Sequence, residues 1–278
     1  MNNVVDLKII KELEAAVAQE TDEQITERIR DKFSILTDMT KAVRRGDVRA
    51  MIVAGPPGVG KSYGVEDVLQ RDGIFDKIGG NKPKYEIVKG ALSALGLYAK
   101  LFEFRDSGNV LVFDDCDSIF FDDLSLNICK AALDSGERRY INWNTDSRLL
   151  RNSDIPSRFE FCGAAIFITN IKFNHVRSKK LRDHLDALQS RCHYIDLGMD
   201  TDREKMLRIK QVIADNKMLE RYNFEPEAEK EVIDFVENNQ TKLSELSLRM
   251  VLKIADLRRS IPAHWAKMAN TTCFGQRR

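Results

Sequence analysis

Long apolar stretches are missing from this 278-residue sequence, in which no run approaches 18 apolar residues. That absence excludes a transmembrane helix, and we expect no membrane partner. An excess of charge of one sign is also missing, because 44 Lys and Arg stand against 43 Asp and Glu, for a formal net charge of +1. Composition as a whole therefore indicates neither a nucleic-acid partner nor a membrane surface, although local basic patches stay compatible with both.

Cysteine is scarce and unpaired. The five cysteines are an odd number, and none of them forms a C-x-x-C pair. This pattern excludes a disulfide framework and a zinc site of the usual spacing, and it favours reduced thiols in a cytoplasmic protein. The N-terminal segment carries charges from Asp6 onward, so it does not resemble a secretory signal.

What is present is a globular composition, with 43% apolar and 31% charged residues. Five short apolar runs alternate with segments of helical period, which predicts an α/β fold with a parallel five-stranded sheet and flanking helices. The predicted strands cover residues 50–54, 85–88, 109–113, 164–169 and 194–197.

The strands stop near residue 199, and helical periodicity continues without them. We therefore expect an N-terminal helical segment, an α/β nucleotide-binding domain, a small all-helical lid domain and a flexible tail. Their expected bounds are 1–29, 30–198, 199–270 and 271–278.

The most specific motif follows the first predicted strand. Gly55-Pro56-Pro57-Gly58-Val59-Gly60-Lys61-Ser62 matches the P-loop pattern G-x-x-x-x-G-K-[ST], with Tyr63 directly after it. Glycines let backbone N–H groups turn toward phosphates, and the following helix N-terminus favours negative charge. The motif predicts that this segment binds a nucleotide, that Lys61 reaches its phosphates and that Ser62 ligates Mg²⁺.

A second acidic motif ends the third predicted strand, 53 residues after Lys61. Asp114 and Asp115 follow four apolar residues, as expected of carboxylates that hold the metal and orient the attacking water in nucleotide hydrolysis. We assign Asp114 to Mg²⁺ and Asp115 to water activation, where glutamate is more usual. Asp117 extends the acidic run and is an alternative base.

The segment Leu111-Val-Phe-Asp-Asp-Cys-Asp-Ser-Ile-Phe120 resembles the Walker B segment of AAA+ ATPases, with aspartate in place of glutamate. The resemblance implies three further site residues. Asn170, at the end of the next buried strand, resembles sensor 1; Arg191, before the last strand, resembles the arginine finger; and Arg249, in the helical domain, resembles sensor 2. More loosely, the segments around Asp114, 126–138 and Asn170 resemble uncharacterised AAA+ ATPases of tailed bacteriophages.

The resemblance implies an enzyme that binds ATP and Mg²⁺ and hydrolyses ATP between the subunits of a homo-oligomeric ring, for which a hexamer is expected. Hydrolysis would remodel a macromolecule, protein or DNA, in the cytoplasm, which is the host's if a phage encodes the chain. Two alternatives stay open: an ATP-controlled DNA-handling switch of helicase or clamp-loader type, and a nucleotide-binding scaffold with little turnover. ATP turnover with and without single-stranded DNA would separate the three.

Three other segments each have more than one interpretation. Leu97 and Tyr98 either grip a polymer in a central pore or belong to a buried helix face. The hairpin predicted over 135–144, with Arg138, Arg139, Tyr140 and Trp143, either holds single-stranded nucleic acid or packs on the protein. The basic segment 175–182 contacts DNA, lines a subunit interface or is a solvated surface.

Overall fold

The structure is a computed structural model, and it describes residues 20–78, 83–144, 154–173, 176 and 178–275. They form two compact units, Lys32–Gly198 and a second unit that combines residues 20–31 with 199–275. Helix α2, Asp22–Arg45, contributes residues to both units. Within these described ranges, no helix is long and apolar enough to cross a membrane.

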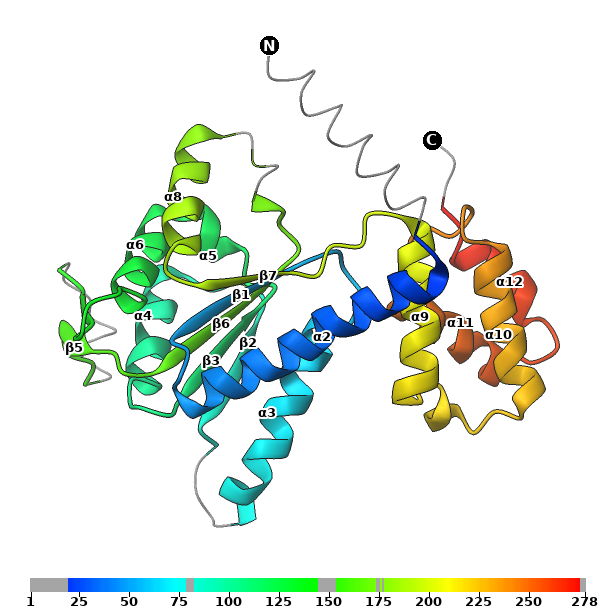
Figure 1. The fold of residues 1–278 in the computed structure, drawn as a ribbon, viewed down its shortest axis with the longest axis horizontal. Coiled ribbons are helices and arrows are strands. Elements are labelled where there is room, and N and C mark those ends of the chain that lie inside the picture. Colours follow the sequence, from blue (N-terminus) through cyan, green and yellow to red (C-terminus); the bar gives the residue numbers. More distant parts are fainter. Residues whose placement is uncertain (1–19, 79–82, 145–153, 174–175, 177, 276–278) are drawn as a thin grey trace. The chain divides into compact units, whose positions relative to one another are not determined.

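The first unit is built on a five-stranded sheet in which each neighbouring pair is parallel (Figure 1). This confirms the fold class predicted from the sequence. The strand order is β2-β3-β6-β1-β7, so β6 lies between β1 and β3. The strands are β1 Ala50–Ala54, β2 Tyr85–Lys89, β3 Val110–Asp114, β6 Ala164–Thr169 and β7 His193–Asp196.

The three central strands, β1, β3 and β6, are buried at every position. Each is therefore a continuous apolar run, because helices cover both faces of the sheet. Alternate side chains enter two cores: Ile52 and Phe113 face one, and Met51 and Val53 face the other. Helices α2 and α3 cover the second face, and α4, α5, α6 and α8 cover the first (Figure 1). The helices are α3 Lys61–Ile78, α4 Ala94–Glu103, α5 Ser118–Phe121, α6 Asp123–Ala132 and α8 Lys179–Gln189.

Helix α4 decides between the two interpretations of residues 97 and 98. Leu97 and Tyr98 are both fully buried, and the Tyr98 hydroxyl donates a 2.8 Å hydrogen bond to the Pro156 carbonyl. The pore interpretation is therefore wrong for these side chains, and the buried helix face is correct. Leu92 and Phe102 pack on the same core, so their apolar spacing also reflects contact with that core.

The hairpin has wider bounds than the sequence predicts. Its strands are β4, Tyr140–Asn142, and β5, Arg158–Glu160, which pair antiparallel; residues 145–153 between them lie outside the described residues. Trp143 is half-buried, with its ring 5.5 Å from that of Tyr98. Trp143 thus packs on the protein.

The second unit is helical around its own apolar core. A capping box fixes the start of α9, because Thr201 and Glu204 exchange side-chain and backbone hydrogen bonds. Arg28 of α2 pairs with Glu204 at 3.1 Å. The sequence predicts a flexible tail from residue 271. Residues 271 and 272 belong to α12 in the structure, and Cys273 after them is buried. The helices are α9 Asp202–Asn216, η2 Glu220–Tyr222, α10 Pro226–Asn238, α11 Leu248–Ser260 and α12 Trp265–Thr272.

Candidate active site

The P-loop connects the carboxyl end of β1 to the N-terminus of α3, which begins at Lys61. Gly58 and Gly60 have φ values of 72° and 100°, a conformation that side chains with a Cβ rarely adopt. These glycines therefore let the loop turn tightly before the helix. Helix α3 begins directly at the loop, so its free N–H groups and its dipole favour an anion there.

The Lys61 ammonium is buried under this loop, with the residue 6% exposed. It donates hydrogen bonds to the carbonyls of Gly55 and Pro56, both at 2.8 Å, and to Asn170 Oδ1 at 2.7 Å. These oxygens offset the cost of burying a charge. The same three bonds hold the ammonium inside the loop, where a phosphate group would lie.

Ser62 and Asp114 form a pair of oxygen donors beside Lys61. The Ser62 hydroxyl donates a 2.7 Å hydrogen bond to Asp114 Oδ1, and Asp114 is buried at the end of β3. Mg²⁺ prefers oxygen ligands and usually takes one or two protein groups together with waters and phosphate oxygens. A hydroxyl and a carboxylate at this distance fit that requirement. The described residues contain no cluster of three or more acidic, His or Cys side chains able to hold a metal alone.

Asp115 is exposed and has a φ of 54°, in the left-handed region. Aspartate adopts this conformation more readily than most residues, so the backbone itself favours a short acidic residue here. Asn170 Nδ2 donates a 2.9 Å hydrogen bond to Asp115 Oδ1. Because Asn170 Oδ1 accepts from Lys61, one amide joins the phosphate lysine to the candidate base.

Thr169 is a site residue that sequence reasoning missed. Its side chain is fully buried at the end of β6, and its hydroxyl donates a 2.7 Å hydrogen bond to Asp117 Oδ1. A polar residue closing an otherwise apolar strand was the available signal. Burial raises the pKa of Asp117, and the negative charge of Asp115 raises it further. The hydrogen bond from Thr169 and the positive charge of Lys61 lower this pKa, but each by less than burial raises it.

Cys116 lies among these acids but is not a nucleophile. Burial raises the pKa of the thiol to about 11, and the negative charge of Asp114 is the next largest cause of this rise. The thiol therefore stays protonated at neutral pH, and it donates to the Val88 carbonyl at 3.3 Å.

Arg191 lies away from the P-loop of its own chain. It precedes β7, whose first residue His193 pairs with Met51 near the start of β1, whereas the P-loop follows the other end of β1. The Arg191 side chain is 31% exposed; it donates to the Ala187 carbonyl at 2.6 Å, and its Nε lies 3.9 Å from Asp134 Oδ1. The structure thus does not bring Arg191 together with Lys61.

Arg249 belongs to the helical unit. It is exposed in the first turn of α11, which Ser247 caps by accepting from the Met250 N–H. Within the described part of the chain, Arg249 forms no ion pair. A cation at a helix N-terminus opposes the helix dipole, so this position is not explained by local stability.

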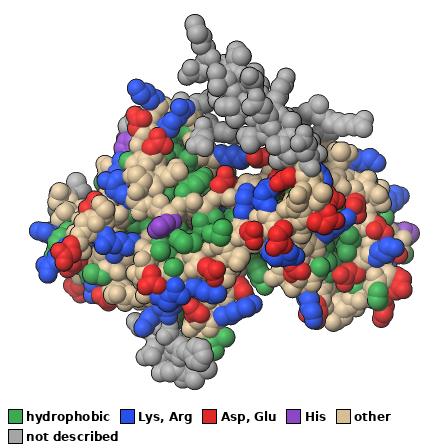
Figure 2. Space-filling model, in the orientation of Figure 1, with side chains coloured by type: hydrophobic (Ala, Val, Ile, Leu, Met, Phe, Trp, Pro, Cys, Tyr) green, Lys and Arg blue, Asp and Glu red, His purple; other side chains and the backbone are tan. Residues whose placement is uncertain are grey.

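Charged side chains of both signs are visible on one face of the molecule (Figure 2). On the face shown in Figure 2, Lys and Arg side chains lie interspersed with Asp and Glu. Of the basic segment 175–182, residues 175 and 177 lie outside the described residues. Arg182 is exposed, and its guanidinium donates to the Val176 carbonyl at 2.7 Å.

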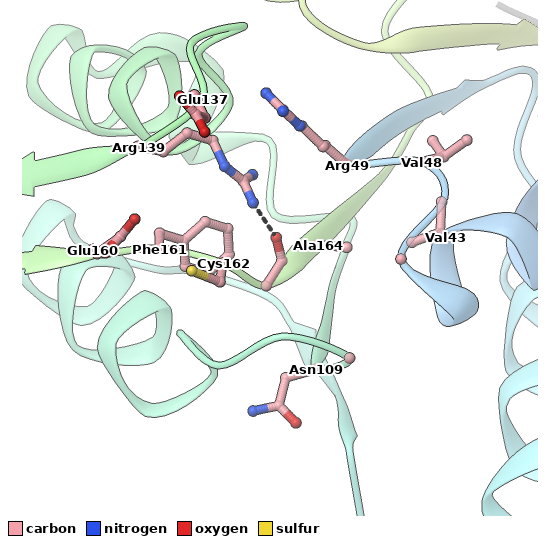
Figure 3. Close-up of a pocket in the computed structure, with 13 residues that line it drawn as sticks. Val43, Val48, Arg49, Asn109, Glu137, Arg139, Glu160, Phe161, Cys162 and Ala164 are labelled. Carbon is pink, nitrogen blue, oxygen red and sulfur yellow. Dashed lines mark hydrogen bonds between the residues drawn. The ribbon is translucent and has the colours of Figure 1, made fainter.

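A separate pocket of about 230 Å³ opens at the amino ends of β1, β3 and β6, the opposite end of the sheet from the P-loop (Figure 3). Arg139 lines it and donates to the Gly163 carbonyl at 3.0 Å. Burial, with the Arg49 charge second, lowers the pKa of Arg139. Arg139 is only 7% exposed and does not face solvent, whereas the neighbouring Arg138 side chain is 72% exposed, so the nucleic-acid interpretation of the hairpin stays open. No residue predicted to bind or hydrolyse the nucleotide lines this pocket.

Fold and site together define the class of the protein. A P-loop follows the central strand β1, acids follow β3, and the intervening strand β6 ends at Thr169 and Asn170, which contact both groups. This is the strand order and site arrangement of a P-loop α/β fold, as the resemblance to AAA+ ATPases implies.

The chain belongs to the same family as an uncharacterized 36.7 kDa protein of Enterobacteria phage T4, from the nrdC-mobD intergenic region. The two are 34% identical over 253 residues, which are 90% of this chain and 76% of the phage protein. No protein-family model matches the sequence.

Similar solved structures include the replication initiator DnaA bound to AMPPCP and single-stranded DNA, with 14% identity and a TM-score of 0.46. The Saccharomyces cerevisiae Hsp104:casein complex is another, with 14% identity and a TM-score of 0.44. The Aeropyrum pernix ORC2 protein in its ADP form has 12% identity and a TM-score of 0.48. These alignments cover 86%, 85% and 87% of this chain, and 63%, 39% and 68% of those chains. All three TM-scores are below 0.5.

Proposed function

We propose that the protein is an Mg²⁺-dependent ATPase of the AAA+ class. The observation that carries the proposal is the hydrogen-bonded chain from Lys61 through Asn170 to Asp115, with the Ser62–Asp114 pair beside it. A lysine for phosphate, an oxygen pair for the metal and an oriented carboxylate are the groups that nucleotide hydrolysis requires.

Each side chain then has one role. Residues 55–63 surround the triphosphate, and Lys61 binds its outer phosphates as a point charge. Ser62 and Asp114 would hold Mg²⁺, which would supply positive charge beside the phosphate oxygens. Asp115 accepts a proton from the attacking water, and the Asn170 amide keeps that carboxylate oriented.

Arg191 supports an oligomeric mechanism. It lies at the amino end of the strands, whereas the P-loop of its own chain lies at their carboxyl end. Arg191 therefore acts on the nucleotide of a neighbouring subunit. A homo-oligomeric ring, with six subunits expected, supplies such a neighbour. Arg249, in the first turn of α11, takes the sensor 2 role that the resemblance implies. The cycle remodels a macromolecule, protein or DNA, in the cytoplasm.

ATP turnover by the purified full-length chain tests this proposal. Wild type should hydrolyse ATP only with Mg²⁺, and Asp115→Asn should keep ATP binding while losing turnover. Asparagine tolerates the left-handed backbone at residue 115, so the fold should be unaffected. Asp106→Asn, an exposed residue before the amino end of β3, is the matched control and should hydrolyse ATP normally.

The result also separates the alternatives. Turnover that rises sharply with single-stranded DNA would favour the DNA-handling switch. ATP binding with no turnover under any condition would favour the scaffold. Asp115→Asn with wild-type turnover would contradict the assigned base.

A further inference from the structure

Lys89 is a charged residue that the proposed mechanism does not use. It is the last residue of β2, and the parallel register pairs it with Asp114, the last residue of β3. Its ammonium nitrogen lies 3.5 Å from Asp114 Oδ2 and 3.8 Å from Glu66 Oε2. The sheet register therefore brings an ammonium to the carboxylate assigned to the metal.

The two oxygens of Asp114 have different partners. Oδ1 accepts from Ser62, whereas Oδ2 faces Lys89. The Asp114 side chain is 7% exposed, and a carboxylate this deeply buried is stable when a cation accompanies it. Lys89 is 58% exposed, so its ammonium can leave for water at little cost.

We propose that Lys89 is the resident counter-cation of Asp114, which it releases when Mg²⁺ enters with a nucleoside triphosphate, so that Lys89 sets the Mg²⁺ dependence of nucleotide binding. This inference rests on the proposed function, because it assumes that Ser62 and Asp114 receive the metal. An ammonium and a divalent cation repel each other, so Mg²⁺ on either oxygen of Asp114 weakens the hold of this carboxylate on Lys89.

The structure provides a second partner for Lys89 after this exchange. Glu66 follows Ser62 by four residues on α3, so both lie on the same face of that helix. Its carboxylate is already within 4 Å of the Lys89 ammonium and is 37% exposed. A small rotation of the lysine stem therefore moves the ammonium from Asp114 to Glu66 without leaving it unpaired.

The test measures equilibrium binding of a fluorescent ATP analogue during Mg²⁺ titration, for wild type, Lys89→Met and Lys84→Met. Methionine keeps a long unbranched stem and removes the charge. Lys84 is exposed just before the other end of β2, about 16 Å along the strand, so Lys84→Met is the matched control for net charge. Lys89→Met should lower the Mg²⁺ concentration at the binding midpoint about three- to tenfold. Lys84→Met should leave it unchanged.

Two more variants strengthen the test. Lys89→Arg keeps the charge and should keep the wild-type midpoint, whereas Lys89→Gln, a second neutral variant, should behave as Lys89→Met. An unchanged or raised midpoint in the neutral variants would overturn the inference, provided that wild type binds the analogue and Lys61→Ala does not. Failure of wild type to bind the analogue would instead overturn the proposed function.

Discussion

The amide of Asn170 donates a 2.9 Å hydrogen bond to the carboxylate of Asp115, 55 residues earlier in the chain. The bond exists because β6 lies beside β3 in a parallel sheet, so their carboxyl ends meet at one edge.

Asn170→Ala should lower ATP turnover about 10²- to 10³-fold, the usual loss when one oriented donor is removed from a reacting centre. Affinity for an ATP analogue should fall much less, because Lys61 keeps its two carbonyl partners. Steady-state turnover and analogue binding measure the two effects. Asn109→Ala, before the amino end of β3, is the control. Equal losses of turnover and affinity would contradict the positioning role.

The raised pKa of Asp117 makes its contribution to stability depend on pH. In the folded protein this carboxyl keeps its proton to higher pH than in the unfolded chain, so the free energy of unfolding falls as pH rises from the ordinary Asp value through the raised one. Asp117→Asn removes this loss, and its amide oxygen can still accept from Thr169. In urea unfolding without nucleotide or metal, the free energy of unfolding of the variant should therefore exceed that of wild type by more at pH 7 than at pH 4. A larger advantage at pH 4 would contradict the assignment.

Arg191→Ala should bind ATP and hydrolyse it poorly, because comparable arginines contribute about 10³- to 10⁵-fold in rate. Lys61→Ala should not bind ATP. A mixture of the two variants should regain part of the activity, since some interfaces then combine an intact P-loop with an intact arginine. Turnover per subunit in wild type should also fall on dilution. If mixing restores nothing and dilution has no effect, Arg191 does not act between subunits.

Tyr98→Phe should lower the free energy of unfolding by about 1 kcal/mol, the usual cost of one buried hydrogen bond, and Tyr98→Ala by about 3–5 kcal/mol. Burial raises the pKa of this phenol to about 12, so the loss should be constant across neutral pH. Chemical denaturation measures both values. ATP turnover of Tyr98→Phe should match wild type, and a selective loss of substrate-stimulated turnover would contradict the core assignment.

The sequence predicted the parts of the site that lie within one local motif. The P-loop and the acids after residue 113 are contiguous, and the buried strands are visible as apolar runs because both sheet faces are covered. Asn170 was found because it ends such a run.

Contacts that depend on strand order were not predictable in the same way. Lys89 meets Asp114 only because β2 lies beside β3 in that register, and Thr169 meets Asp117 only because β6 is the other neighbour. Residues 97 and 98 were ambiguous for another reason: apolar helical spacing is the same for a core face and for a gripping surface, and only burial distinguishes the two.

The uneven accessibility of the thiols provides a single position for a chemical label. Cys116, Cys129 and Cys273 are buried, and burial raises the pKa of Cys192 to about 12, so these four react slowly with maleimides. Cys162 is exposed at the rim of the pocket on the amino side of the sheet. A fluorophore attached there would report on that surface. The P-loop lies at the opposite end of β1 and would stay unmodified.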